Sequence, residues 1–119
     1  METILLIDDD VQVRMLVKIV LEDAGYRFIS VESGKQGLGH LKHQDADLIL
    51  VDIFMPDMDG LELLPLLRTA RPASKIIAIT AGSGERNFLY IAKRLGANDI
   101  LRKPFVRQEL LDAVALQLA

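Results

Sequence analysis

The sequence predicts an α/β protein with a doubly wound, five-stranded parallel sheet and helices on both faces. Five short apolar runs, mostly rich in Ile, Val and Leu, alternate with five longer stretches of helical period. Runs that are apolar throughout are typical of strands that helices cover on both sides. A chain of 119 residues fits one domain. The predicted order is therefore strand and helix repeated five times, with right-handed crossovers.

The predicted strands are short, and Asp, Gly or Thr bounds most of them. They cover residues 4–7, 26–31, 48–51, 76–79 and 100–101. Because these runs are short and mostly rich in Ile, Val and Leu, buried parallel strands are the favoured interpretation.

The first three helices are predicted from apolar residues at spacings of three and four. The first stripe runs over residues 13–24, and Gly25 follows where a C-cap glycine belongs. Residues 34–43 form the weakest helix, because Gly37 and Gly39 lie inside it. The third helix begins at 59 or 60 and contains Pro65, which removes a backbone donor. A short or kinked helix is expected there.

The last two helices show clearer stripes. The fourth is formed by Phe88, Ile91, Ala92 and Leu95 and is closed by Gly96. The fifth is formed by Leu110, Leu111, Val114 and Leu118. Strands and helices thus alternate to the end of the chain.

The charge, hydropathy and cysteine content of the chain argue against several classes of function. The net charge of −3 and the scattered Lys and Arg residues argue against a nucleic-acid surface. No apolar run reaches the roughly 18 to 20 residues that a membrane span needs. The opening Met-Glu-Thr lacks a basic stretch before an apolar core, so no cleaved signal is expected. Without cysteine, disulfides and thiolate metal sites are excluded, which is compatible with a cytoplasmic location.

Polar residues gather at the predicted carboxyl ends of the strands, where ligands bind in doubly wound sheets. They are Asp8, Asp9, Asp10, Asp52, Thr80 and Lys103. Clustered carboxylates repel one another unless a hard cation such as Mg²⁺ is bound. Beside an ammonium and a hydroxyl group, such a cluster indicates phosphoryl transfer, with a carboxylate as a candidate nucleophile.

Four separated motifs make the prediction specific. They are Asp8-Asp9, the segment DIFMPDMDG at 52–60, ITA at 79–81 and RKPF at 102–105. In this order, and over essentially the whole chain, the sequence resembles the response-regulator receiver family of bacterial two-component systems. The resemblance implies a flavodoxin-like receiver fold and a single receiver domain over residues 1–119.

The resemblance also implies a metal site. Asp9 ligates Mg²⁺ directly and Asp8 through water, and the main-chain carbonyl of Phe54 and the Asp52 carboxylate complete the protein ligands. Mn²⁺ can substitute for Mg²⁺.

The phosphoryl site follows in the same way. Asp52 accepts the phosphoryl group, Lys103 pairs with Asp52 or its phosphate, and the Thr80 hydroxyl moves inward to bind it. The Lys103-Pro104 bond is often cis in this family. Asp10 is interpreted as a helix N-cap rather than a ligand.

As a function, the resemblance implies a phosphorylation-activated switch, not an enzyme in the usual sense. A sensor histidine kinase or phosphotransfer protein supplies the phosphoryl group. The response passes through the face of the fourth helix, fifth strand and fifth helix to an effector or fused output domain. A phosphorylation-dependent homodimer is compatible with this. On that face Leu89, Tyr90, Ala115 and Leu116 lie off the apolar stripes and are candidate contacts.

Three positions depart from the commonest family pattern. Ile100 stands where many receivers have Tyr or Phe, which puts the usual coupling of Thr80 to an aromatic ring in doubt. Phe54 and Gly82 follow Asp52 and Thr80 by two residues, where the family controls attack by water. A slowly hydrolysed phosphate is the hypothesis. Gly82 and Gly84 predict a flexible switching loop.

Alternative interpretations remain open at this point. The acids could be solvated strand ends, Thr80 a β-branched strand residue, and Lys103 an exposed lysine. His40 and His43, three apart, could bind metal but are interpreted as surface histidines. Rival functions are a haloacid-dehalogenase-like phosphatase, a flavodoxin-like electron carrier and a receiver that only binds partners. Gln12 disfavours the first, and the acids after the first strand disfavour the second.

Overall fold

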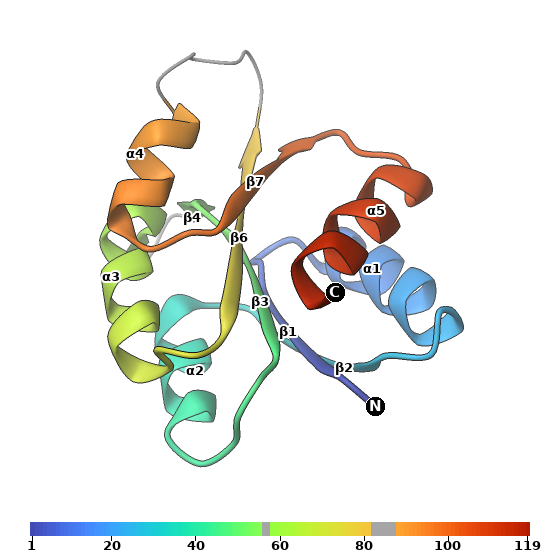
Figure 1. The fold of residues 1–119 in the computed structure, drawn as a ribbon, viewed down its shortest axis with the longest axis horizontal. Helices are drawn as coiled ribbons and strands as arrows, with labels where there is room; N and C mark the ends of the chain where they lie inside the picture. The colour runs from blue at the N-terminus through green and yellow to red at the C-terminus, as the bar shows by residue number, and fades with distance from the viewer. Residues whose placement is uncertain (56–57, 82–87) are drawn as a thin grey trace.

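A five-stranded parallel sheet forms the centre of the computed structural model, which describes residues 1–55, 58–81 and 88–119. The strands are β1 (Thr3–Ile7), β2 (Arg27–Val31), β3 (Leu48–Asp52), β6 (Lys75–Ala81) and β7 (Asp99–Lys103). Their order across the sheet is β2-β1-β3-β6-β7, as Figure 1 shows. The predicted parallel sheet is confirmed. A separate two-residue antiparallel pair, β4 (Phe54–Met55) with β5 (Met58–Asp59), was not predicted.

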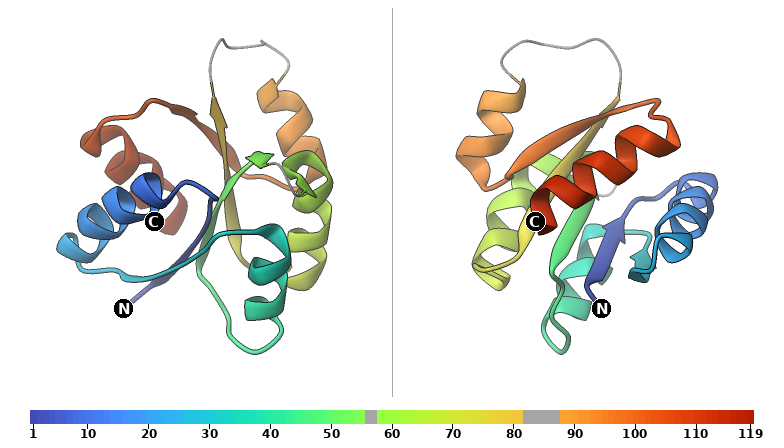
Figure 2. Two further views of the ribbon diagram at one scale, coloured as in Figure 1. Left: turned by 180° about the vertical axis from the view of Figure 1, so that it is seen from behind. Right: turned by 45° about the vertical axis from the view of Figure 1, so that its right-hand side comes forward.

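The helices form two layers. One face of the sheet is covered by α1 (Val11–Asp23) and α5 (Arg107–Leu118). The other is covered by α2 (Gly34–Leu41), α3 (Gly60–Ala70) and α4 (Phe88–Leu95), as the two views of Figure 2 show. Among the described residues, no helix combines the length and apolar character that crossing a membrane requires.

Two apolar cores lie on opposite sides of the sheet because successive strand residues point to opposite faces. In β1, Leu5 and Ile7 join the core beneath α2, α3 and α4. Ile4 and Leu6 join the core beneath α1 and α5. All four are fully buried. Burial on both faces is why this strand has no polar alternation.

The predicted strand ends need correction where strand pairing extends the ladder past the apolar run. β6 continues through Thr80 to Ala81, and β7 continues to Lys103, because Ala81 and Lys103 are paired across the two strands. β2 begins one residue later than predicted, at Arg27, and α2 ends at Leu41 rather than at 43.

The helix ends largely follow the sequence. The Asp10 side chain accepts a 2.9 Å hydrogen bond from the Gln12 backbone N–H, so Asp10 caps α1 as predicted. Gly25 and Gly96 follow α1 and α4 with positive φ of 96° and 123°, conformations that L side chains rarely adopt. Pro65 is exposed and α3 continues past it to Ala70, so a short third helix is excluded.

One arginine ties three elements together at the amino end of the sheet. The Arg68 guanidinium, on α3, donates to the Gly96 carbonyl at 2.8 and 3.2 Å and to the Ser74 carbonyl at 2.6 Å. It also donates to Asn98 Oδ1 at 2.9 Å, which accepts a second bond from the Ile76 N–H at 2.8 Å. We call this group the Arg68 clasp. It fixes the chain just beyond α4 to α3 and to the start of β6.

Candidate functional site

Three carboxylates meet at the carboxyl edge of the sheet. Asp8 directly follows β1, and Asp52 ends β3, the neighbouring strand. One ligand oxygen from each of Asp8, Asp9 and Asp52 lies within 4.8 Å of the others. The strand order reverses at β1, so the cluster lies at the topological switch point, where ligands of such sheets bind. The structure thus brings together three of the predicted site residues.

Lys103 lies between two of these acids. Its Nζ is 3.0 Å from Asp8 Oδ2 and 3.1 Å from Asp52 Oδ2, and it donates a hydrogen bond to Asp52. The exposed fractions of the side chains are 22% for Lys103, 0% for Asp8 and 6% for Asp52. The Lys103-Pro104 peptide bond is cis, as the resemblance suggested. A solvated, unpaired lysine is therefore excluded at this position.

The two oxygens of the Asp8 carboxylate have different partners. Asp8 Oδ1 accepts a 2.9 Å bond from the Asp10 N–H, and the Asp8 carbonyl accepts from Arg14 Nη1 at 2.7 Å. Asp8 Oδ2 is buried and has no hydrogen-bond partner among the described residues, so its contact with Lys103 is an ion pair. Burial raises the pKa of the Asp8 carboxyl, against the opposing effects of the Asp10 N–H and Lys103.

The same contacts act on the lysine in the opposite sense. Burial by itself lowers the pKa of Lys103, but its contacts with the Asp8 and Asp52 carboxylates outweigh burial, and the pKa is raised. Lys103 is therefore a fixed positive charge at neutral pH. Two carboxylates share this one ammonium group.

Both oxygens of the Asp52 carboxylate are bound. Oδ2 accepts from Lys103, and Oδ1 accepts a 2.9 Å hydrogen bond from the Phe54 backbone N–H. In the neighbouring strand Ile79 lies opposite Asp52, so Thr80 lies one residue nearer the carboxyl edge, and it is 6% exposed. Thr80 is thus placed at the edge that carries the acids.

An aromatic contact that the sequence analysis did not predict adjoins the site. The ring of Phe54 lies 6.1 Å from the ring of Phe88, centroid to centroid, at an interplanar angle of 36°. Phe88 is the first residue of α4 and, like Ile100, packs against the core beneath α2, α3 and α4. The two predicted loop glycines, Gly82 and Gly84, lie outside the residues that the structure describes.

An apolar hollow of about 440 Å³ borders Lys103 between α1 and the segment after β7. It is lined by Val13, Leu16, Ala81, Lys103, Pro104 and Phe105. Leu16, which was predicted in the buried stripe of α1, is 52% exposed here. The hollow places an apolar surface directly beside the polar cluster.

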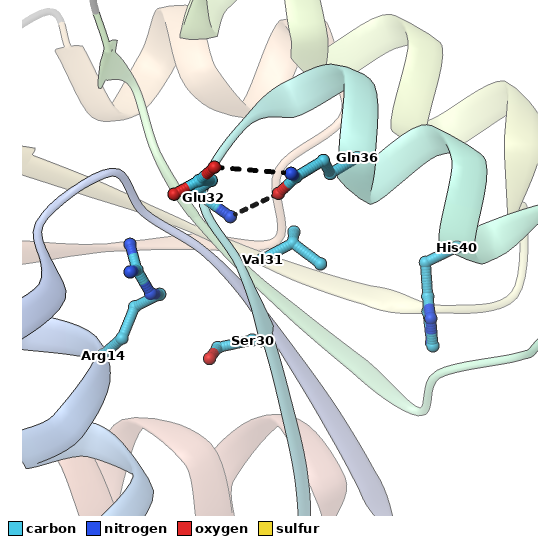
Figure 3. A pocket seen from close by; sticks show the side chains of 6 residues that line it. All are labelled: Arg14, Ser30, Val31, Glu32, Gln36 and His40. Atoms are coloured by element: carbon cyan, nitrogen blue, oxygen red, sulfur yellow. Dashed lines mark hydrogen bonds between the residues drawn. The ribbon is translucent and has the colours of Figure 1, made fainter.

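A second, more open hollow runs along the outer edge of β2 (Figure 3). It is lined by Arg14, Ser30, Val31, Glu32, Gln36 and His40. His43 is exposed, as predicted, but His40 is half-buried, and its Nε2 has no hydrogen-bond partner within the described ranges. His40 therefore lies at the surface only in part, as one wall of this hollow, and neither histidine belongs to a candidate metal group among the described residues. Of the described residues, only the three aspartates form a candidate metal group.

The arrangement as a whole suits transfer of a phosphoryl group to a carboxylate. Oxygen ligands for a hard cation lie beside Asp52, and a fixed ammonium group stands where it can neutralise developing negative charge. Simple helix capping explains Asp10 but does not explain the other acids converging on Lys103.

Comparison with known proteins supports this assignment. The sequence model of the response regulator receiver domain matches residues 4–115. The chain is 34% identical over 113 residues to sporulation initiation phosphotransferase F of Bacillus subtilis, covering 95% of this chain and 90% of that one. It is 36% identical over 114 residues to the CAI-1 autoinducer sensor kinase/phosphatase CqsS of Vibrio cholerae, covering 94% of this chain but only 17% of that protein.

Solved structures agree. The chemotaxis response regulator CheY4 of Vibrio cholerae superposes with a TM-score of 0.92 at 28% identity, over 99% of both chains. The family match, the relatives and the fold therefore coincide with the four motifs in the sequence. The chain belongs to the response regulator receiver domain family of two-component systems.

Proposed function

We propose that this chain is a phosphorylation-activated signalling switch that accepts a phosphoryl group on Asp52, from a sensor histidine kinase or a phosphotransfer protein. The observation that carries the proposal is the Asp52 carboxylate itself. It is nearly buried, it is held at both oxygens, and it lies within one cluster with two further acids and Lys103. General switching by phosphorylation is the function of the family to which the chain belongs.

The donor set fits Mg²⁺. All candidate ligands are oxygens, which are the donors that Mg²⁺ prefers, and three of them are carboxylates that lie within 4.8 Å of one another. Asp8, Asp9, Asp52 and the main-chain carbonyl of Phe54 would hold the ion, and Mn²⁺ could replace it. When bound, such an ion neutralises the oxygens of the phosphoryl group.

The residues of the chain account for the transfer itself. A carboxylate oxygen of Asp52 forms the new bond to phosphorus as the bond from phosphorus to the donor breaks, and the donor keeps that electron pair. Lys103 stabilises the charge on the transferring group, and Thr80 binds a phosphoryl oxygen afterwards. Because the acceptor is a side chain of the protein, the reaction is stoichiometric, and the chain is not an enzyme in the usual sense.

We propose that the surface formed by α4, β7 and α5 binds the partner that receives the signal. Tyr90 on α4 and Leu116 on α5 are 63% and 67% exposed there. A downstream effector, an attached output domain or a second copy would bind this edge after phosphorylation. Replacing Tyr90 and Leu116 with alanine should then weaken the phosphorylated complex, and an unchanged affinity would contradict this surface.

The relatives differ greatly in length, and the chain spans between 17% and 90% of those named above. A single receiver domain over residues 1–119, acting in the cytoplasm without binding nucleic acid or membrane, is part of the proposal. The apolar hollow beside Lys103 supports docking of the phosphodonor at that side, since it borders Lys103, which contacts the acceptor Asp52.

The proposal is tested by intact-protein mass spectrometry after incubation with acetyl phosphate and Mg²⁺. We expect one adduct of about 80 Da, the mass of one phosphoryl group, that requires Mg²⁺ and is absent from Asp52→Ala. Continuous release of phosphate from simple phosphate monoesters would instead favour a phosphatase. No adduct on the wild type would favour a receiver that only binds partners.

The slow loss of the phosphoryl group remains a prediction that rests on Phe54 and on Gly82, which lies outside the described residues. The decay of the adduct after removal of acetyl phosphate measures it. A lifetime of seconds in the presence of Mg²⁺ would contradict it.

A further inference from the structure

The Phe54 and Phe88 ring pair joins the phosphoacceptor segment to the first turn of α4. Phe54 contacts the site through its backbone, because its N–H donates at 2.9 Å to Asp52 Oδ1. Its side chain, 56% exposed, points away from the core to meet the ring of Phe88 at 6.1 Å. One residue therefore touches both the acceptor carboxylate and α4.

The opposite end of α4 is fixed. Gly96, the residue after α4, accepts two hydrogen bonds from Arg68 through its carbonyl, and the Asn98 N–H donates to the Ile76 carbonyl at 2.7 Å. Between these ends Ala92 is the only α4 residue that is fully buried. A force on α4 should therefore move its first turn, where Phe88 lies, more than its last turn.

Phosphorylation of Asp52 changes the acceptors that are available to the Phe54 backbone N–H. In the unmodified chain the two carboxylate oxygens are taken by Phe54 and Lys103. Converting one oxygen to an acyl phosphate and adding three acceptor oxygens gives the Phe54 N–H new competing partners. A displaced backbone at Phe54 carries its ring with it.

We propose that the Phe54–Phe88 ring pair holds α4 in its unphosphorylated position and is released when Asp52 is phosphorylated, so that Phe54 and Phe88 are positioning residues of the switch. This inference rests on the proposed function. It assigns the coupling to a contact present in this chain, in which Ile100 occupies the position where the resemblance expects an aromatic ring.

The thermodynamic linkage between the ring pair and phosphoryl binding predicts the direction in which affinity should change. A contact that stabilises only the unphosphorylated arrangement opposes binding of a phosphoryl group, because the ligand must disrupt it. An aromatic pair of this kind shifts a two-state equilibrium by roughly two- to tenfold. Removing the Phe88 ring should therefore strengthen binding of a phosphoryl mimic by that factor.

The experiment uses beryllium fluoride with Mg²⁺ as the mimic and follows the backbone amide signals of α4 by NMR. We expect Phe88→Leu to lower the dissociation constant roughly two- to tenfold. Its α4 signals should already lie part of the way toward the bound positions before beryllium fluoride is added. Phe88→Tyr, which keeps a ring, should behave as the wild type. Lys93→Ala, at an exposed position on the same helix, is the control and should bind beryllium fluoride as the wild type does.

A double-mutant cycle tests the pair directly. In a Phe54→Leu background, Phe88→Leu should have no further effect, because the contact is already lost. An unchanged or weaker affinity in Phe88→Leu, or an undiminished effect of Phe88→Leu in the Phe54→Leu background, would overturn the inference while leaving the proposed function intact. Failure of the wild type to bind beryllium fluoride and to take a label from acetyl phosphate would overturn the proposed function itself, and the inference with it.

Discussion

The amino and carboxyl ends of the sheet differ in how well their polar groups are matched with partners. At the amino end, the Arg68 guanidinium is surrounded by carbonyl oxygens of the loops and by the Asn98 amide, so its donors meet matched acceptors. At the carboxyl end, three carboxylates lie close together, and two of them, Asp8 and Asp52, share the single ammonium group of Lys103.

The difference separates residues that stabilise the fold from residues that await a ligand. A satisfied buried network rigidifies the elements that it joins. Clustered negative charges lower stability until a cation binds among them. Substitutions at the amino end should therefore change the free energy of unfolding, and those at the carboxyl end should change the chemistry.

The largest expected effect is at Lys103. Lys103→Ala removes the only cation within 4 Å of Asp52 in the described structure, and by analogy with the loss of one charge-stabilising donor the labelling rate should fall by roughly 10²- to 10³-fold. The measurement is the initial rate of labelling by acetyl phosphate. Lys75→Ala, at the exposed amino end of β6, is the matched control and should label at the wild-type rate. A rate within twofold of wild type for Lys103→Ala would contradict the assigned role.

Arg68→Ala should produce the converse result. It leaves the carbonyls of Gly96 and Ser74 without their donor, and we expect the free energy of unfolding to fall by about 2 to 3 kcal/mol, measured by urea denaturation. The labelling stoichiometry should remain one. Arg94→Ala, an exposed arginine on α4, should change stability by less than about 0.5 kcal/mol. Loss of labelling in folded Arg68→Ala would contradict the claim that residues at the amino end of the sheet affect only stability.

The charge on Asp8 should lower stability until a metal binds. Burial raises the pKa of Asp8 in the folded chain, so the stability that depends on its protonated form is present below the unfolded value of 3.8 and is lost as the pH rises through the folded value. In metal-free solution at pH 7, Asp8→Asn should therefore unfold at a higher urea concentration than wild type.

Two changes of condition should reduce the difference in stability between Asp8→Asn and the wild type. Acidification below the unfolded pKa of Asp8 should remove the difference, since the wild-type carboxyl is then protonated in both states. Excess Mg²⁺ should stabilise wild type by about 2.7 kcal/mol at 100 times its dissociation constant, and Asp8→Asn by less. A less stable Asp8→Asn in metal-free solution would show that the Lys103 ion pair outweighs burial.

The smallest effect is expected at Asp10, which adjoins the acids in sequence but only caps α1. Asp10→Ala should cost about 1 kcal/mol of stability, while Asp10→Asn should retain most of it. Labelling should be unchanged in both, because the Asp10 contact with Asp8 is made by its backbone N–H. A labelling defect in Asp10→Asn would instead show that the Asp10 side chain takes part in phosphorylation.

The convergence of Asp8, Asp52 and Lys103 could be predicted from sequence because parallel strands bring their carboxyl ends to one edge. The lengths of β6 and β7 could not, since they extend by pairing with each other beyond their apolar residues. The pairing between the two strands cannot be detected in the local sequence of either one.

Contacts that depend on tertiary placement were also missed. The acceptors of Arg68 are mostly backbone carbonyls, which every residue carries, so no residue pattern reveals the clasp. Phe54 and Phe88 belong to elements far apart in the chain, and neither lies at a position whose period predicts the other. The partial burial of His40 depends in the same way on how α2 packs.

The most direct test of the account is to identify the labelled residue chemically. Borohydride reduces an aspartyl phosphate to homoserine and releases phosphate, so the acceptor can be read from peptides by mass spectrometry. After treatment with acetyl phosphate and Mg²⁺, we expect homoserine at position 52 and unmodified aspartate at positions 8 and 9. Homoserine at 8 or 9 with an intact Asp52 would contradict the central claim that Asp52 is the phosphoacceptor.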